Sequence, residues 1–109
     1  MKLAAVATRN ERSAREAAES FGADRWFSDP LAMIHDDSVD VVTISVKVPA
    51  HRELVLAALD AGKTVYCEAP LGCTVPETEE MAAAVGSLHA VIGLQGRLDP
   101  AVRRAAQLL

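Results

Sequence analysis

The sequence is poor in aromatic side chains and has no cluster of basic residues. Aromatic residues make up 4% of its 109 residues, too few for a surface on which nucleic-acid bases stack. The formal net charge is -4 and the Lys and Arg residues are scattered, which argues against a surface for nucleic acids or anionic membranes. No apolar run approaches the length of a membrane span. We therefore expect no nucleic-acid partner and no membrane partner.

The sequence also has little metal-binding or nucleophilic chemistry. Its two cysteines, Cys67 and Cys73, lie six residues apart without a CxxC or histidine-paired spacing, so we interpret them as reduced thiols. There is no Gly-rich phosphate loop, Ser-His-Asp order or metal-ligand cluster, and His35 and His89 are interpreted as surface residues. The first six residues are too short and too quickly polar for a signal peptide. We expect a cytoplasmic protein without a metal site.

What the sequence has in quantity is apolar residues, which make up 50% of the chain. That is enough for the packed core of one small domain. Short β-branched runs predict strands over residues 3–7, 25–27, 39–46, 64–67 and 89–94. Helices are predicted over 11–21, 31–34, 49–61, 75–85 and from 99 to the C-terminus. Strands that alternate with helices indicate an α/β domain with a parallel sheet and crossover helices.

Capping residues mark the ends of the predicted helices. Asn10 is suited to cap the first helix and Gly22 to end it. Ala14, Ala17, Ala18 and Phe21 are predicted to form the buried stripe of that helix.

The stretch 67–72, Cys-Glu-Ala-Pro-Leu-Gly, stands where a strand should end at the carboxyl edge of the sheet. Ligands of parallel α/β sheets bind at that edge. Thr74 and Glu77 then form a Thr-x-x-Glu capping box, which predicts the start of a helix. A strand, a polar corner and a capped helix are typical of an active-site edge, although an ordinary connecting loop has the same pattern.

The strings VDVVTISVKVPAHRELVLAALDAGKTVYCEAPLG and GLQGRLDPAVRRAAQLL resemble the Gfo/Idh/MocA oxidoreductases. Val46-Lys47-Val48, His51 and residues 94–97 are closest to the branch that contains the fungal galactose-pathway repressor. The resemblance implies an N-terminal Rossmann domain for NAD or NADP, with a three-layer α/β fold. It also implies a second domain that holds a sugar-like substrate in full-length relatives.

Two departures from the family pattern affect this expectation. The chain lacks the family's first strand and its G-x-G-x-x-G turn, and it stops before the substrate domain. We therefore expect residues 1–109 to form a partial NAD(P)-binding Rossmann domain with the substrate domain absent. Without that first strand, the strands at 3–7 and 39–46 either pair directly or leave an open edge. An open edge predicts self-association, as a dimer or larger species.

The resemblance places candidate cofactor-binding residues after the strands. Thr8 and Arg9 follow the first strand, where a hydroxyl and a guanidinium suit the 2′-phosphate of NADP better than NAD; the alternative is a solvated Arg9 beside a capping Asn10. The other candidates are Ser45, Val46, Lys47, His51, Glu68, Ala69, Gln95 and Arg97. For Lys47 the alternative, a surface lysine, is the more common outcome, and His51 is equally consistent with a structural histidine.

The segment Glu68-Ala69-Pro70 matches the family's Glu-Lys-Pro signature, whose lysine assists proton transfer in active dehydrogenases. Here that position is Ala69, which cannot exchange a proton, so no catalytic residue is assigned. Glu68 is a candidate for hydrogen bonding to the nicotinamide ribose, and Pro70 for a cis peptide bond.

Three functional hypotheses follow. The first is an NAD(P)-dependent oxidoreductase acting on a sugar- or cyclitol-like hydroxyl or carbonyl, present as its cofactor-binding part. The second is a non-catalytic regulator that senses a dinucleotide, which the alanine at position 69 favours. The third is an inactive fragment that folds only with a complementary chain.

Overall fold

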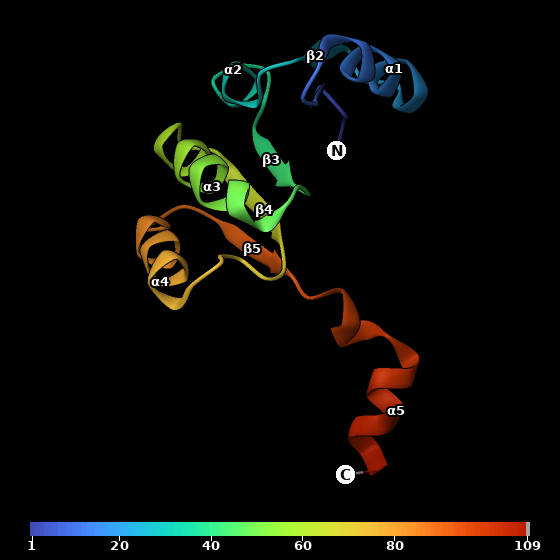
Figure 1. Cartoon of the computed structure of the whole chain (residues 1–109), viewed down its shortest axis with the longest axis vertical. Helices are drawn as coiled ribbons and strands as arrows, with labels where there is room; N and C mark the ends of the chain where they lie inside the picture. Colours follow the sequence, from blue (N-terminus) through green and yellow to red (C-terminus); the bar gives the residue numbers. More distant parts are fainter. Residues whose placement is uncertain (109) are drawn as a thin grey trace.

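Five strands and five α-helices alternate along residues 1–108, as the sequence predicts (Figure 1). The computed structural model describes residues 1–108, apart from the side chains of residues 97 and 98. The strands are β1 (Ala5–Ala7), β2 (Arg25–Phe27), β3 (Val41–Ile44), β4 (Thr64–Glu68) and β5 (Ala90–Gly93). The helices are α1 (Glu11–Phe21), α2 (Pro30–Ile34), α3 (His51–Asp60), α4 (Val75–Ala84) and α5 (Pro100–Leu108).

Local capping signals set the ends of α1. Asn10 Oδ1 accepts a hydrogen bond from the Ser13 amide at 2.9 Å, and Gly22 ends the helix with φ 69°, so both predictions are confirmed. The predicted buried stripe holds for Ala14 and Ala18 but is wrong for Phe21, which is 74% exposed. The helix is about 16 Å long, whereas the three-residue strands of the sheet it packs on extend about 10 Å, too short to cover its last turn.

All strand pairings are parallel, but they form two separate sheets. β1 pairs with β2, and β3, β4 and β5 form the second sheet in that order, with Ile44 opposite Cys67 and Cys67 opposite Ile92. Among residues 1–108, β1 and β3 do not pair with each other. Of the two alternatives for these strands, the structure therefore adopts the open edge.

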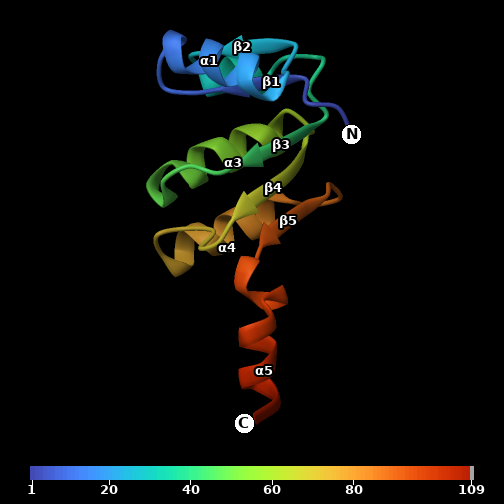
Figure 2. The same cartoon turned by 90° about the vertical axis from the view of Figure 1, so that its right-hand side faces the viewer.

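The core lies on one face of the β3–β4–β5 sheet, where α3 and α4 are on the same side (Figure 2). Alternate residues of the strands point into it, so that Val42 and Ile44 of β3 are buried together with Val65 and Cys67 of β4. The helices and the segment before β3 contribute Ile34, Val39, Leu54, Val55, Ala58, Leu59 and Met81. This period of two follows from the pleat of a strand.

The opposite face of the same sheet carries exposed apolar side chains. Val41 is 42%, Tyr66 38% and Val91 56% exposed. The α/β parallel fold expected from the sequence is confirmed, but the three-layer arrangement is realised on one face only of this sheet in the described residues. Helix α5 extends away from the sheet (Figure 1), and all of its residues are exposed.

Helix α2 joins the two sheets. It contacts β1 and β2 on one side and α3 on the other, and its last residue, Ile34, is 1% exposed in the core. The turn after it adds polar links: the Asp36 carboxylate pairs with Arg25, and the Asp36 carbonyl accepts a hydrogen bond from Lys63 Nζ at 3.1 Å. Hydrogen bonds from Ser38, with the charge of Arg25, hold the pKa of the Asp36 carboxyl below its usual value.

No helix within residues 1–108 has both the length and the apolar character needed to cross a membrane.

The packing of α4 predicts how a core substitution acts. Met81 is 1% exposed, whereas Val75 on the same helix is 70% exposed. Met81→Ala should lower the free energy of unfolding by about 2–5 kcal/mol, because it leaves a cavity between α4 and the sheet. Val75→Ala is the matched control and should change it by less than about 0.5 kcal/mol. Denaturant titration followed by circular dichroism measures both, and equal effects would contradict this packing.

Candidate functional site

The carboxyl ends of β3, β4 and β5 meet at one edge because these strands are parallel and adjacent. Polar side chains follow each of them: Ser45 and Lys47 after β3, Glu68 at the end of β4, and Gln95 shortly after β5. The resemblance to the family predicts these residues after the strands, and the parallel order brings the strand ends together. Ligands of open α/β sheets bind outside this edge.

Two of the predicted residues contact each other at this edge. Gln95 Nε2 donates a hydrogen bond to Glu68 Oε1 at 3.1 Å. The pair lines an open hollow of about 560 Å³. The other lining residues are Ala69, Gly93, Leu94 and Gly96. The hollow therefore presents a carboxylate, an amide and backbone groups, which are suited to bind a ligand's hydroxyl groups.

Tyr66 is a neighbour of this hollow that sequence reasoning missed. A Cβ built on Gly93 would collide with the Tyr66 hydroxyl and lie 2.7 Å from ring carbon Cζ. The ring therefore passes over Gly93, on the sheet face that no helix covers. Gly93 itself could have indicated this contact from the sequence, since a glycine inside a strand often marks a close approach of another group.

His51 lies behind the edge rather than on its surface. It is 1% exposed, and its Nε2 lies 2.9 Å from the Val46 carbonyl oxygen. Its Nδ1 lies 3.4 Å from Cys67 Sγ. Its Nδ1 is also 3.1 Å from the carbonyl oxygen of Pro70 and 3.2 Å from that of Leu71. The ring is thus enclosed by protein groups, which supports the structural interpretation of this residue.

The loop after β3 lies next to the His51 ring, which contacts its Val46 carbonyl. Ser45, Val46 and Lys47 are all exposed. The loop is held in place by the Lys47 carbonyl, which accepts a hydrogen bond from the Ala50 amide at 2.9 Å. The Lys47 amine is therefore accessible, as both the ligand-binding and the surface-lysine interpretation require.

The residues after β1 are arranged around the start of α1. Thr8 Oγ1 lies 2.5 Å from Ser13 Oγ and 3.0 Å from the Asn10 carbonyl oxygen. Arg9 is exposed, and Asn10 caps the helix. Thr8 and Arg9 belong to the other sheet, so the structure does not bring them into contact with Glu68 and Gln95.

The loop after β4 agrees with the sequence in its peptide geometry. The Ala69–Pro70 bond is cis, which confirms the prediction at Pro70. Ala69 is exposed beside Glu68. The side chain of Arg97, also a predicted cofactor-binding residue, lies outside the described part of the chain.

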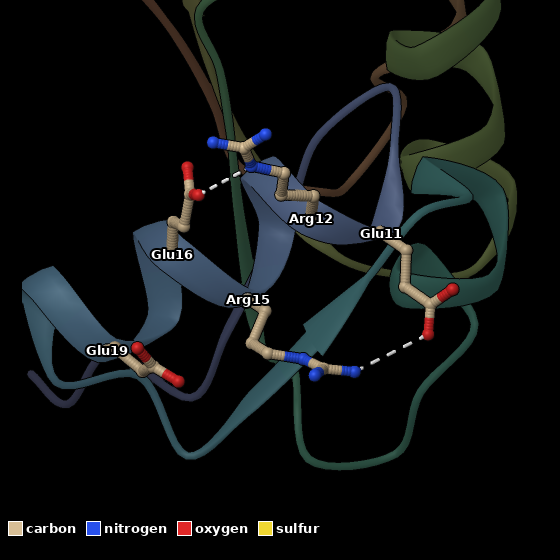
Figure 3. Close-up of a pocket in the computed structure, with 5 residues that line it drawn as sticks. All are labelled: Glu11, Arg12, Arg15, Glu16 and Glu19. Carbon is tan, nitrogen blue, oxygen red and sulfur yellow. Dashed lines mark hydrogen bonds and ion pairs between the residues drawn. The ribbon is translucent and has the colours of Figure 1, made fainter.

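A second hollow, of about 410 Å³, lies along the outer surface of α1. Figure 3 shows that its lining consists of charged side chains, which pair with each other except for Glu19. Arg12 Nε is 2.9 Å from Glu16, and Arg15 is 3.6 Å from Glu11. These are i,i+4 pairs on a solvated helix surface. The hollow is lined by α1 alone and does not lie at the edge where β3, β4 and β5 end, so it is not a candidate site.

Comparison with known proteins identifies the family of this chain. The family described as an oxidoreductase family with an NAD-binding Rossmann fold matches residues 1–95. The chain belongs to the Gfo/Idh/MocA family. Myo-inositol 2-dehydrogenase of Thermotoga maritima is 34% identical over 99 residues, which cover 89% of this chain and 30% of that protein.

Solved structures of this family have the same fold. A levoglucosan dehydrogenase in complex with NADH and levoglucosan is 34% identical, with a TM-score of 0.75 over 81% of this chain and 25% of that one. A 3-ketoreductase from Actinomadura kijaniata, in complex with TDP-benzene and NADP, is 29% identical, with a TM-score of 0.85 over 98% of this chain and 33% of that one. The chain spans about a third of the length of the curated relatives it matches.

The described residues fit one end of a dinucleotide better than the other. Glu68 and Gln95 supply a carboxylate and an amide for ribose hydroxyls. A pyrophosphate is normally held by the amides of a Gly-rich turn at a helix N-terminus. The sequence contains no such turn, and at the start of α1 the Ser13 amide already donates to the Asn10 side chain. The fit is therefore to the ribose and nicotinamide end.

The two cysteines should react with thiol reagents at very different rates. Cys67 is 1% exposed and Cys73 is exposed. Burial, with the nearby charge of Glu68, raises the pKa of the Cys67 thiol, which lowers the fraction of reactive thiolate. In a disulfide-exchange assay, one thiol per native chain should react rapidly and the second only after unfolding. Cys73→Ser should abolish the fast phase; if it persists, Cys67 is accessible.

The same pKa shift predicts the direction of a pH dependence. Above the ordinary thiol pKa the unfolded chain releases the Cys67 proton, whereas the folded chain retains it. The folded state then binds more protons, so the free energy of unfolding should fall as the pH rises through this range. Cys67→Ser, which has no titrating thiol, is the control for denaturant titrations at several alkaline pH values. An equal pH dependence in that variant would contradict the assignment.

Proposed function

We propose that this chain is the NAD(P)-binding part of an oxidoreductase that acts on a hydroxyl or carbonyl carbon of a sugar- or cyclitol-like substrate. The observation that supports it most is the Glu68–Gln95 pair at the carboxyl edge of the sheet. In this proposal residues 1–109 form a partial Rossmann domain, and the substrate is held by a domain outside this sequence.

Each polar residue of the edge has a role in the proposal. Glu68 and Gln95 bind the hydroxyls of the nicotinamide ribose, and Ser45 and Lys47 contact the cofactor from the neighbouring loop. The cofactor supplies hydride chemistry, while the protein orients it. Ala69 cannot exchange a proton, so the acid or base must be a group other than this residue.

The missing Gly-rich turn sets the affinity expected of the 109 residues. Hydrogen bonds to charged groups contribute about 1.5–3 kcal/mol each. Losing two or three of them removes roughly 3–9 kcal/mol, whereas a micromolar complex corresponds to about 8 kcal/mol. Binding by this chain alone should therefore be weaker than micromolar.

NADP is the preferred cofactor in this proposal. Thr8 and Arg9 follow β1 where a carboxylate would be needed to bind the ribose hydroxyls of NAD. Arg9 is exposed and available to a 2′-phosphate. Relatives with NADH and with NADP in their structures both exist, so the choice rests on these residues.

A second candidate function is a regulator that binds the dinucleotide without turning it over. Ala69 favours it, because the position of the family's signature lysine carries no ionisable group. The two functions differ in hydride transfer: a regulator should bind NADPH without oxidising it in the presence of a sugar ketone, even when the complete second domain is supplied.

The proposed site can be mapped by amide chemical shifts. NADPH added up to millimolar concentration should shift amides of residues 45–47, 68–69 and 95–96 without saturating. NADPH should also shift residues 8–10 more than NADH does, and Arg9→Ala should remove that difference. Arg12→Ala, which removes an exposed arginine from α1, is the matched control and should retain it.

Two results would contradict the proposal. Shifts confined to α1, or no shifts at the edge at millimolar NADPH, would exclude the Glu68–Gln95 hollow as the site. Saturable micromolar binding would contradict the expected affinity and show that other groups hold the pyrophosphate.

Self-association through the open edge of β3 is also part of the proposal. Asp40 O accepts from the Thr64 amide, and by parallel alternation the backbone groups of Val41 and Thr43 point away from β4. Exposed strand edges of this kind pair with other chains.

Sedimentation should therefore detect a dimer or larger species of the chain. Thr43→Lys should weaken it, because a charge at an edge opposes pairing. Ala83→Lys, which adds the same charge on the exposed surface of α4, is the control. A monodisperse wild-type monomer would contradict this part of the proposal.

A further inference from the structure

The ring of His51 is surrounded by one possible donor and three acceptors. Val46, Pro70 and Leu71 present carbonyl oxygens, which can only accept. Cys67 presents a thiol, which can donate a weak hydrogen bond. A neutral imidazole carries one N–H, so its two nitrogens cannot both donate.

The two neutral forms of the ring satisfy these neighbours differently. With the proton on Nε2, the ring donates to the Val46 carbonyl at 2.9 Å, and Nδ1 is free to accept from the Cys67 thiol at 3.4 Å. With the proton on Nδ1, the ring reaches the Pro70 and Leu71 carbonyls, but the Nε2 lone pair then faces the Val46 oxygen at 2.9 Å, acceptor against acceptor. The first form also leaves the Nδ1 lone pair 3.1 and 3.2 Å from the Pro70 and Leu71 oxygens, but it is the form in which each nitrogen has one hydrogen-bonding partner of the opposite kind.

The ring is 1% exposed, and none of the groups in contact with it is a carboxylate. The thiol remains available as a donor because burial raises the pKa of Cys67.

We propose that the Cys67 thiol fixes the Nε2–H tautomer of His51, and that His51 thereby positions the loop carrying Lys47. Val46 O and the Lys47 amide belong to the same peptide unit, so a hydrogen bond to one restrains the other. Cys67 lies in β4 directly before Glu68, so the link runs from the end of β4 through the ring to the loop after β3. His51 is a positioning residue that touches no ligand.

The consequence for the cofactor rests on the proposed function, but the link itself does not. Its state is read without any dinucleotide. Failure of NADPH to shift the edge would therefore leave the link intact, and failure of the link would leave the Glu68–Gln95 hollow as the proposed site.

The first test is the ring's tautomer in the native chain. With ¹⁵N-labelled histidine, the ring signals of His51, assigned by their loss in His51→Gln, should show the proton on Nε2. Cys67→Ser retains a donor and should keep this form. Cys67→Ala removes the donor and should shift the tautomer ratio toward Nδ1–H by about twofold to tenfold, the worth of one hydrogen bond.

The second test is amide hydrogen exchange at Lys47. His51→Leu should accelerate it by about twofold to tenfold relative to the amides of β5. His51→Gln places a side-chain N–H near the position of Nε2 and should restore the wild-type rate, whereas a purely space-filling role would not distinguish Gln from Leu.

Three outcomes would overturn the proposal: an Nδ1–H ring in the wild type, an unchanged tautomer ratio in Cys67→Ala, or equal exchange at Lys47 in the Gln and Leu variants. If the leucine variant does not fold, the wild-type tautomer and the comparison of Cys67→Ser with Cys67→Ala still decide.

Discussion

The packing of α3 and α4 on one face of the β3–β4–β5 sheet is the interaction on which the rest of the structure depends. It buries the inward residues of β3 and β4, which fixes the register of the ladder, since a slip by one residue would expose them. The fixed register brings the three strand ends to one edge and Gln95 to Glu68. Core packing therefore places the residues of the candidate site at one edge, without requiring contacts between those residues.

Local signals made most of the fold predictable from the sequence. The Asn10 cap and the Thr74 capping box act within four residues, so no knowledge of the tertiary structure is needed to interpret them. The apolar run in 39–46 predicted a strand correctly, although β3 is shorter than expected and covers Val41–Ile44. Parallel order predicts that the strand ends meet at one edge, and the resemblance to the family supplied most of the polar residues expected there.

The remaining features depend on contacts between segments distant in the sequence. Phe21 is exposed because the sheet beneath α1 is short, and the length of a neighbouring sheet cannot be deduced from the helix's own periodicity. The enclosure of His51 needs the loop at Pro70 to fold back over α3. The approach of Tyr66 to Gly93 depends on the β4–β5 register. The resemblance to the family identified the carboxyl edge of the sheet as the candidate ligand-binding edge, but it predicted none of these contacts.

Because β1 and β3 do not pair within residues 1–108, α2 has a function beyond connecting two strands. In a continuous sheet the ladder itself fixes the distance between any two strands. Here α2 and the turn at Asp36 are what hold the two sheets at their separation, with Ile34 anchored in one and Arg25 in the other. The packing of α2 against α3 therefore sets the distance between Arg9 and Glu68. That distance determines how long a ligand must be to contact both residues.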